Sequence, residues 1–290
     1  MYNSFMDNLR RTLIENGTFD EERALYGTVN ADVINCTFAG PADGESALKE
    51  CRNVNVAGCS FSLRYPLWHA ENFNLTDAKM DELARAALWY CKKGYIGKST
   101  LGGIKALREC RGITLENSNI VSPEFGWRCD GVTMNDCSAT SEYFMFESKN
   151  LRFKNVNFTG KYSFQYVKNA VIEDSDFNTK DAFWHSKNVT VKNTRLKGEY
   201  LGWYSEGLTL VNCVISGTQP LCYCKNLRLI GCRTEGCDLS FEYSDVHADV
   251  IGEILSVKNP KSGKIVADGF GEVIFGDNNV PCRGKVIKRV

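Results

Sequence analysis

The sequence repeats itself with a period of ~19 residues, and this period constrains the fold more than any other feature. From Lys93 onward each copy follows the previous one at this same interval, while two of the earlier intervals are longer and mark small insertions near residues 40–43 and 80–83. Each copy opens on a turn residue, usually Asn or Gly. The copies start at Asn30, Asn53, Asn72, Lys93, Gly112, Gly131, Asn150, Asn169, Asn188, Gly207, Asn226 and Asp245.

Within each copy, apolar and polar residues alternate as they do in a β-strand that buries one face. The fourth residue is apolar, for example Leu115, Ile172 and Val191, and the residue before it is mostly polar. A unit of this length with a strand in constant phase and no helical periodicity is typical of one turn of a parallel β-solenoid. We therefore predict an all-β fold, a right-handed parallel β-helix of about twelve coils stacked at the strand spacing of ~4.8 Å.

The repeat predicts a single domain, residues 1–290. Residues 26–253 form the coils, and both ends of an open solenoid need a cover for their unpaired strand edges. Residues 1–25 are expected to form an N-terminal cap, as a short amphipathic helix or strand, and residues 254–290 a C-terminal cap. The apolar residues at helical spacing in the first cap are Phe5, Met6, Leu9, Leu13 and Ile14.

The 35 basic and 35 acidic side chains give a formal net charge of zero. Nucleic acids and anionic membranes usually bind proteins with a basic excess, so neither is predicted as a partner. No apolar run approaches the ~20 residues of a membrane span, and the first residues lack a secretory signal. These features predict a cytoplasmic protein, with homo-oligomerisation left open.

The 13 cysteines mostly occupy two positions of the repeat that are otherwise filled by small residues. This substitution pattern indicates small buried hydrophobic side chains, and a chain with a large core needs no disulfide scaffold. Cys222 and Cys224 lack the spacing of a redox motif or a zinc site, so no metal and no cofactor is predicted. A polar column that includes Asn155, Asp174 and Asn193 predicts a ladder of stacked amides along the rod.

An unusual column lies four residues before each turn residue. It holds every tryptophan of the chain together with Lys49, Arg108, Phe146 and Gln165. An unpaired charge such as that of Arg108 is costly inside a narrow coil, so we predict that the column faces outward. The next column, three residues before the turn, holds Glu, His, Tyr and Arg.

An outward row of aromatic and charged side chains suits a carbohydrate, because rings stack on apolar sugar faces and charged groups bond to hydroxyls. The sequence therefore predicts an oligosaccharide or another polyhydroxylated ligand. A second interpretation is that the stacked aromatic rings only stabilise adjacent turns. The predicted ligand-binding residues are Trp68, Trp89, Arg108, Glu109, Trp127, Arg128, Trp184, His185 and Trp203.

Six runs of sequence stand out beside this pattern: Gly44–Glu50, Arg64–His69, Gly160–Tyr166, Lys180–His185, Gly217–Tyr223 and Ser256–Pro260. Together they resemble a largely bacterial family of unknown function whose expected fold is similar to the right-handed β-helix of pectin-lyase-like proteins. The resemblance covers nearly the whole chain. It implies the architecture and brings no activity.

Two further functions stay open from the sequence. The chain is either a non-enzymatic structural or protein-interaction solenoid, or an enzyme acting on sugars as a hydrolase or lyase. A hydrolase needs two carboxylates ~5–9.5 Å apart, and Asp181 with Glu199 or Glu109 with Glu124 fall on adjacent turns. A lyase would draw on Arg108 and its basic neighbours. No catalytic residue is assigned from the sequence.

Overall fold

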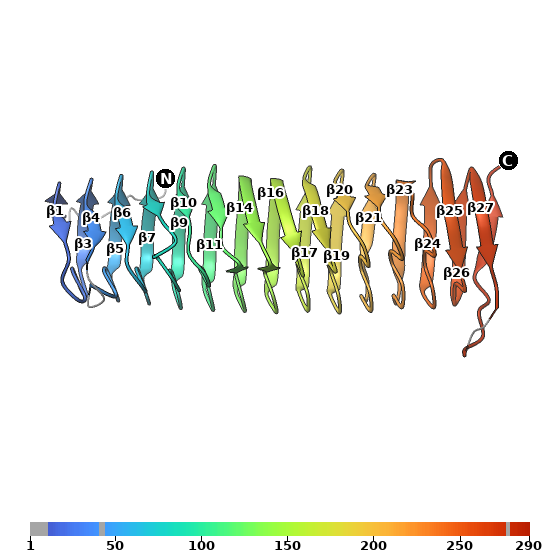
Figure 1. The fold of residues 1–290 in the computed structure, drawn as a ribbon, viewed down its shortest axis with the longest axis horizontal. Helices are drawn as coiled ribbons and strands as arrows, with labels where there is room; N and C mark the ends of the chain where they lie inside the picture. Colours follow the sequence, from blue (N-terminus) through green and yellow to red (C-terminus); the bar gives the residue numbers. More distant parts are fainter. Residues whose placement is uncertain (1–10, 41–43, 277–278) are drawn as a thin grey trace, which may run out of the picture.

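The protein folds into a rod of stacked β-strand turns (Figure 1). The computed structural model describes residues 11–40, 44–276 and 279–290. Regular structure in these residues is β-strand, and the strands pair in parallel into a solenoid of about 14 turns. The predicted all-β parallel solenoid is confirmed. No helix within the described residues is long and apolar enough to cross a membrane.

The strands are short, because each turn of the rod contributes only a few residues to each of its sides. They are β1 (Thr12–Glu15), β2 (Thr18–Phe19), β3 (Val29–Ile34), β4 (Thr37–Ala39), β5 (Arg52–Ala57), β6 (Ser60–Ser62), β7 (Glu71–Thr76), β8 (Lys79–Met80), β9 (Lys92–Gly97), β10 (Thr100–Leu101), β11 (Arg111–Glu116), β12 (Asn119–Val121), β13 (Glu124–Phe125), β14 (Asp130–Ser141), β15 (Tyr143–Phe144), β16 (Lys149–Lys161), β17 (Lys168–Glu173), β18 (Asp176–Lys180), β19 (Lys187–Lys192), β20 (Arg195–Lys197), β21 (Thr209–Val211), β22 (Val214–Ser216), β23 (Leu227–Glu235), β24 (Asp245–Val250), β25 (Glu253–Lys258), β26 (Ser262–Ala267), β27 (Gly269–Ile274) and β28 (Lys285–Lys288).

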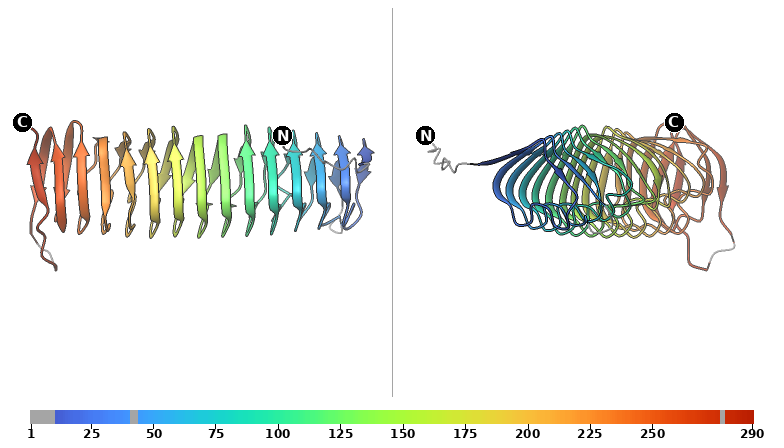
Figure 2. Two further views of the ribbon diagram at one scale, coloured as in Figure 1. Left: turned by 180° about the vertical axis from the view of Figure 1, so that it is seen from behind. Right: turned by 60° about the vertical axis from the view of Figure 1, so that its left-hand side comes forward.

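Each turn has three sides. The first side is a parallel sheet that starts at the turn residue and runs from β1 through β3, β5 and β7 along the rod. The second, begun by β2, β4 and β6, follows after a corner. The third side, which leads into the next turn residue, is mostly tight turns with short strands such as β13 and β15. Figure 2 shows how the turns nest on one another along the rod.

The strand register confirms the period read from the sequence. Lys92 pairs with Arg111, and Arg111 with Asp130, each exactly one period further along the chain. The two insertions also fall where the repeat places them, because the steps from Val29 to Arg52 and from Glu71 to Lys92 are both longer than the period. Residues 41–43 of the first insertion lie outside the described residues.

The segments expected to cover the two ends continue the stack. Thr12 pairs with Ala31, so β1 and β2 form a further turn, as strand and not as helix. Phe5, Met6 and Leu9 lie outside the described residues. At the other end Asp245 pairs with Ser262, a step shorter than the period, and β28 continues that sheet beyond β26. These irregular steps explain why a single fixed period predicts fewer turns than the rod contains.

Stacked aromatic rings fill the middle of the rod. Phe164 is fully buried, and its ring lies parallel to those of Phe177 and Phe183, with centroids 5.5 and 5.2 Å away. Parallel rings at this distance bury a large apolar area and add a favourable ring interaction. The core therefore consists of columns of like residues that continue from one turn to the next.

The amide ladder predicted along the rod is present. The side chain of Asn155 donates to Asp136 over 2.6 Å, that of Asn193 to Asp174 over 3.1 Å, and that of Asn212 to Asn193 over 3.4 Å. Left-handed backbone at this corner, with φ of 51° at Asn155 and 48° at Asn193, explains the preference for Asn and Asp.

All 13 cysteines are free thiols, and all but Cys282 are buried. The interpretation of the cysteines as small buried side chains is therefore confirmed. The thiol of Cys110 donates to the carbonyl of Leu88 one turn earlier, over 2.8 Å, and Cys91 donates to Leu67 in the same way. The cytoplasmic location inferred partly from these residues stays a prediction.

Candidate functional site

The third side of the rod carries the aromatic and charged residues that the sequence singled out. They lie in two neighbouring rows that run parallel to the rod axis, and we call these rows together the aromatic stripe. The first row is Trp68, Trp89, Arg108, Trp127, Phe146, Gln165, Trp184 and Trp203. The second row is His69, Tyr90, Glu109, Arg128, Glu147, Tyr166, His185, Tyr204 and Tyr223.

The direction of the side chains follows from an unusual backbone. Phe164 and Tyr166 adopt φ angles of 57° and 58°, and Phe183 and His185 of 61° and 53°. This left-handed conformation is costly for bulky residues and is held here by hydrogen bonds to the turns on either side. The N–H of Phe183 donates to Ser163 and that of His185 to Trp203, over 2.9 and 3.0 Å. As a result Phe183 points into the core and His185 points into solvent.

The tryptophans face outward but are only partly exposed. Each indole N–H donates to a backbone carbonyl on the next turn. The N–H of Trp89 donates to Lys105 over 2.6 Å, and that of Trp184 to Tyr200 over 2.7 Å. Their ring faces also meet, since Trp184 and Trp203 are nearly parallel with centroids 5.5 Å apart. The tryptophans therefore present their edges to solvent, while neighbours cover much of their faces.

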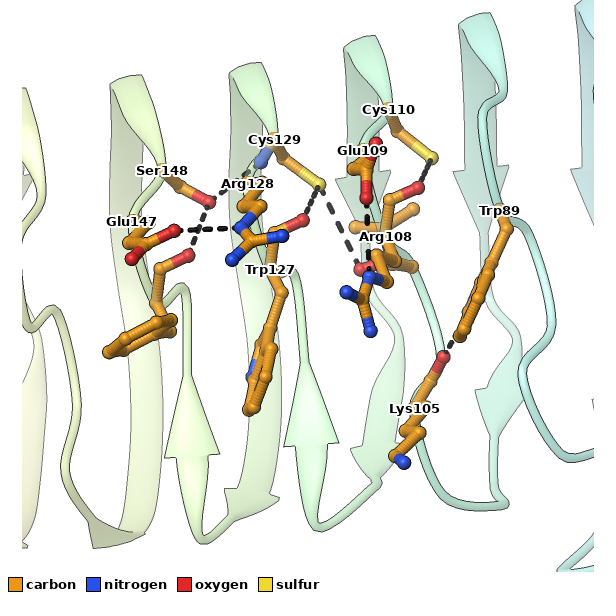
Figure 3. A network of polar contacts seen from close by, with 12 residues as sticks. Trp89, Lys105, Arg108, Glu109, Cys110, Trp127, Arg128, Cys129, Glu147 and Ser148 are labelled. Carbon is orange, nitrogen blue, oxygen red and sulfur yellow. Dashed lines mark hydrogen bonds and ion pairs between the residues drawn. The ribbon is translucent and has the colours of Figure 1, made fainter.

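Arg108 interrupts the tryptophans in the N-terminal half of the stripe (Figure 3). Its guanidinium lies 4.9 Å from the ring centre of Trp89 and 5.7 Å from that of Trp127, so it takes the place of a ring in the stack. Its Nε also donates to Glu109 over 3.4 Å. One turn on, Arg128 and Glu147 form an ion pair of 2.7 Å. Charges in this half of the stripe are therefore already partnered.

The C-terminal half of the stripe has a continuous exposed ladder in its second row. The ring of His185 lies between those of Tyr166 and Tyr204, with centroids 4.9 and 5.0 Å away and planes within 8° of parallel. Tyr223 continues the ladder 4.8 Å beyond Tyr204. Tyr166 and Tyr204 are 45% and 46% exposed. The ring edges, with their polar atoms, line the surface at every turn.

This ladder leads to a hollow near the C-terminal end. The hollow has a volume of about 350 Å³. Its lining combines aromatic rings with groups of both charges: Tyr204, Tyr223, Tyr243, Lys225, Asp245 and Lys261, together with Cys224, Asn279 and Val280. This mixture is typical of sites that bind small polar molecules.

A wider hollow of about 610 Å³ lies over the amide ladder. Its lining includes Asn155, Asp174, Asn193 and Arg195. The amides and carboxylates of the ladder bond to one another from turn to turn, so they mainly serve the rod itself. We therefore place the candidate site on the aromatic stripe.

Gln165 is a polar residue in the first row, in the C-terminal half of the stripe. Gln165 stands where neighbouring turns carry Phe146 and Trp184, and its side chain donates to the backbone carbonyl of Asp181 over 3.1 Å. Asp181 is 6% exposed and lies between the turns of Tyr162 and Tyr200. Burial raises the pKa of the Asp181 carboxyl, and Glu199 adds to the rise, while Lys180 and Lys161 oppose it.

The nine predicted ligand-binding residues are thus all on one side of the rod, in two adjacent rows. The predicted binding residues do not include Tyr166, Tyr204 and Tyr223, although these share the column of His185, and Asp181 is predicted only as half of a carboxylate pair. The signal for the tyrosines was their recurrence at the period of the repeat, beside the tryptophans. Within the described residues, no three His, Cys, Asp or Glu side chains gather as metal ligands would.

Solved structures with a similar fold include PfbA, a surface adhesin of Streptococcus pneumoniae, with 8% sequence identity, a TM-score of 0.40, and coverage of 91% of this chain and 84% of that one. The A-module of the mannuronan C-5 epimerase AlgE6 of Azotobacter vinelandii has 10% identity, a TM-score of 0.38, and coverage of 96% and 90%. The catalytic domain of a GH87 α-1,3-glucanase in complex with nigerose has 11% identity and a TM-score of 0.32, with coverage of 98% and 64%. Similarity at this level carries no information about function.

The sequence has no significant match among curated proteins. A family model matches residues 12–287, nearly the full length of the solenoid. The resemblance noted in the sequence is thereby confirmed, and the chain belongs to the family described as "Protein of unknown function (DUF3737)".

Proposed function

We propose that the protein binds an extended carbohydrate chain along the C-terminal half of the aromatic stripe. The observation that carries this proposal is the ladder of the exposed Tyr166, His185 and Tyr204 and the half-buried Tyr223, whose rings follow one another at 4.8–5.0 Å. This interval is the axial rise of the solenoid, and it is close to the length of one sugar unit in an extended polysaccharide. A chain parallel to the rod therefore meets an equivalent side chain at each turn.

The chemistry of the ladder suits hydroxyl groups. Tyrosine hydroxyls both donate and accept hydrogen bonds, and the imidazole of His185 does the same in its neutral form. Because the rings are stacked on one another, they are held rigidly and lose little conformational freedom when a ligand binds. Trp184 and Trp203 add partly exposed apolar edges beside the ladder.

The other predicted residues fit this proposal as an extension of the same surface. Trp68, Trp89, Arg108, Glu109, Trp127 and Arg128 continue the stripe towards the N-terminus, where a longer chain would reach them. At the opposite end, the hollow of about 350 Å³ beside Tyr223 would receive the terminal sugar. Sugar contact along the ladder comes from hydrogen bonds and ring edges, more than from stacking on flat faces.

The test is a binding measurement on purified protein. Cellohexaose, xylohexaose, laminarin, dextran and polygalacturonate are titrated by calorimetry, with the double variant His185→Ala/Tyr204→Ala as the probe of the ladder. We expect at least one carbohydrate to bind and the double variant to weaken that binding at least tenfold. Ile230→Ala, a change at a side chain that is 50% exposed on the first side of the rod, is the matched control and should leave binding unchanged. Binding by none of the five carbohydrates, or equal binding by the double variant, would contradict the proposal.

A second candidate function, self-assembly, is favoured by the last turn of the rod. Phe270 and Val286, which point towards the core, are only partly buried, and β27 and β28 have strand partners on one side only within the described residues. Sedimentation velocity over a wide concentration range tests this function. Self-assembly through this end predicts a larger species that Val286→Asp abolishes, and a wild-type protein that stays monomeric at high concentration would exclude it.

A further inference from the structure

Asp181 is a buried carboxyl group that lies outside the two rows of the aromatic stripe. It is 6% exposed, and within the described residues its carboxylate oxygens have no hydrogen-bond donor, although its backbone N–H donates to Glu199 over 3.0 Å. Burial makes ionisation of this carboxyl group costly, and a carboxyl with a raised pKa on a ligand-facing surface is a candidate for proton transfer. Its backbone carbonyl accepts the hydrogen bond from Gln165, a polar residue in the first row of the stripe.

The charges around Asp181 are paired with other partners. Lys180 forms an ion pair of 2.8 Å with Glu199, and Lys161 one of 2.7 Å with Glu142. Each ammonium also lies over a ring, 5.2 Å from the centre of Tyr162 for Lys161 and 5.3 Å from that of Tyr200 for Lys180. Asp181 therefore lies between two lysines that are paired with other carboxylates.

The neighbouring carboxyl groups of Asp181 and Glu199 therefore have different surroundings. Asp181 is desolvated, which favours its protonated form, while the Glu199 side chain is half-exposed and forms an ion pair with Lys180. Enzymes that cleave glycosidic bonds need this combination, one carboxyl that gives a proton and one carboxylate that takes a proton from water.

We propose that Asp181 is the proton donor, and Glu199 the base, of a hydrolytic site for glycosidic bonds in the carbohydrate bound on the aromatic stripe. This inference rests on the proposed function, because the bound chain has to pass Gln165 to reach Asp181. Asp181 gives its proton to the glycosidic oxygen as the bond from that oxygen to the anomeric carbon breaks. A solvent water molecule bonds to the anomeric carbon and loses a proton to Glu199. Glu199 then releases its proton to solvent and Asp181 takes one up, so the net change is the addition of water across the bond.

The experiment measures reducing ends released from the five carbohydrates used for binding. We expect the wild type to cleave a carbohydrate that it binds. Asp181→Asn should lower kcat for that substrate by about 10²–10⁴-fold, the usual contribution of a general acid, with binding changed less than twofold. Glu206→Gln is the matched control, because it removes an exposed carboxylate bonded to Lys187, a lysine that does not act on Asp181, and it should keep full activity.

A second readout separates a proton donor from a structural role. The 2,4-dinitrophenyl glycoside of the cleaved sugar has a leaving group that needs no proton, so Asp181→Asn should hydrolyse it at nearly the wild-type rate, whereas Glu199→Gln should not. Binding without cleavage would overturn this inference and leave the proposed function intact, and absence of both would overturn both. An Asp181→Asn variant that is as active as the wild type on the natural substrate, or equally impaired on both substrates, would also overturn it.

Discussion

The indole N–H of Trp184 donates a hydrogen bond to the backbone carbonyl of Tyr200, on the next turn, over 2.7 Å. Trp203 makes the same bond to Gln219 over 2.8 Å, and Trp127 makes it to Tyr143 over 3.2 Å. The bond therefore belongs to the repeat and not to one local site. It ties successive turns together on the side of the rod where strands are short and backbone pairing is least regular.

Replacing Trp184 by Phe should destabilise the rod by about 1 kcal/mol, the net value of a typical hydrogen bond. The variant keeps an aromatic ring against Trp203 but leaves the Tyr200 carbonyl without its donor. Urea unfolding followed by circular dichroism measures the change as a lower midpoint at constant slope. Tyr166→Phe, which alters an exposed ring on the same stripe, is the control and should leave the midpoint unchanged. An unchanged midpoint in Trp184→Phe would show that the hydrogen bond of the indole N–H does not stabilise the rod.

Phe164→Ala should be far more costly, by about 3–5 kcal/mol, as for other large core residues. Phe164 is fully buried, and its ring touches those of Phe144, Phe177 and Phe183. The alanine variant therefore leaves a cavity that spans adjacent turns. The same urea titration measures the loss, and Phe164→Leu, which keeps most of the volume, should recover more than half of it. If the two variants were equally stable, the stacked rings would not be what holds this part of the core.

Much of the fold follows from the sequence because the same side chain meets its own copy one period later. Asn155 and Asn193 indicate a left-handed corner and a ladder, since few other residues suit both. The turns at the ends of the rod cannot be predicted in this way, because their length differs from the period. Asp245 and Ser262 pair across a step shorter than the period, and a search at fixed period cannot align them.

The candidate site is harder to predict, because the sequence does not indicate its left-handed backbone conformation. Phe183 is left-handed although bulky apolar residues rarely adopt this conformation, and His185 is left-handed two residues later. The conformation is imposed by hydrogen bonds to Ser163 and Trp203, on the turns before and after. Lys180 pairs with Glu199 and not with its sequence neighbour Asp181, and the sequence alone does not indicate which of the two carboxylates it takes.

The cysteines give a third prediction, on thiol reactivity. Burial raises the pKa of Cys59 to about 11 and that of Cys51 to about 12, so thiolate is scarce at pH 8. Cys282 alone is not fully buried. Titration of the native protein with Ellman's reagent at pH 8 should therefore find one fast thiol, and titration in guanidinium should find all 13. Several fast thiols in the native state would mean that the turns open readily, and Cys282→Ser should abolish the single fast reaction.

The last prediction concerns the pH dependence of stability at Asp181. Burial raises the pKa of this carboxyl above its ordinary value of 3.8, so the folded state resists its ionisation more than the unfolded state does. The contribution of the neutral acid to stability is full below pH 3.8 and is lost as the pH rises through the raised pKa. Asp181→Asn cannot ionise. Relative to the wild type, the variant should therefore become more stable as the pH rises from 3 to 8, with the difference smallest at the acid end.

Urea midpoints of the two proteins at intervals across this range measure the difference, and all other titrating groups cancel in it. Asp130→Asn provides a contrast of opposite sign, since bonds from Asn150 and Lys149 lower the pKa of Asp130 and make its ionised form stabilising. A gain in stability on removing a charge is expected where a buried group is kept for its chemistry at the expense of the fold. Parallel midpoint curves for wild type and Asp181→Asn would show that the carboxyl is well solvated, and the hydrolytic role inferred for it would lose its physical basis.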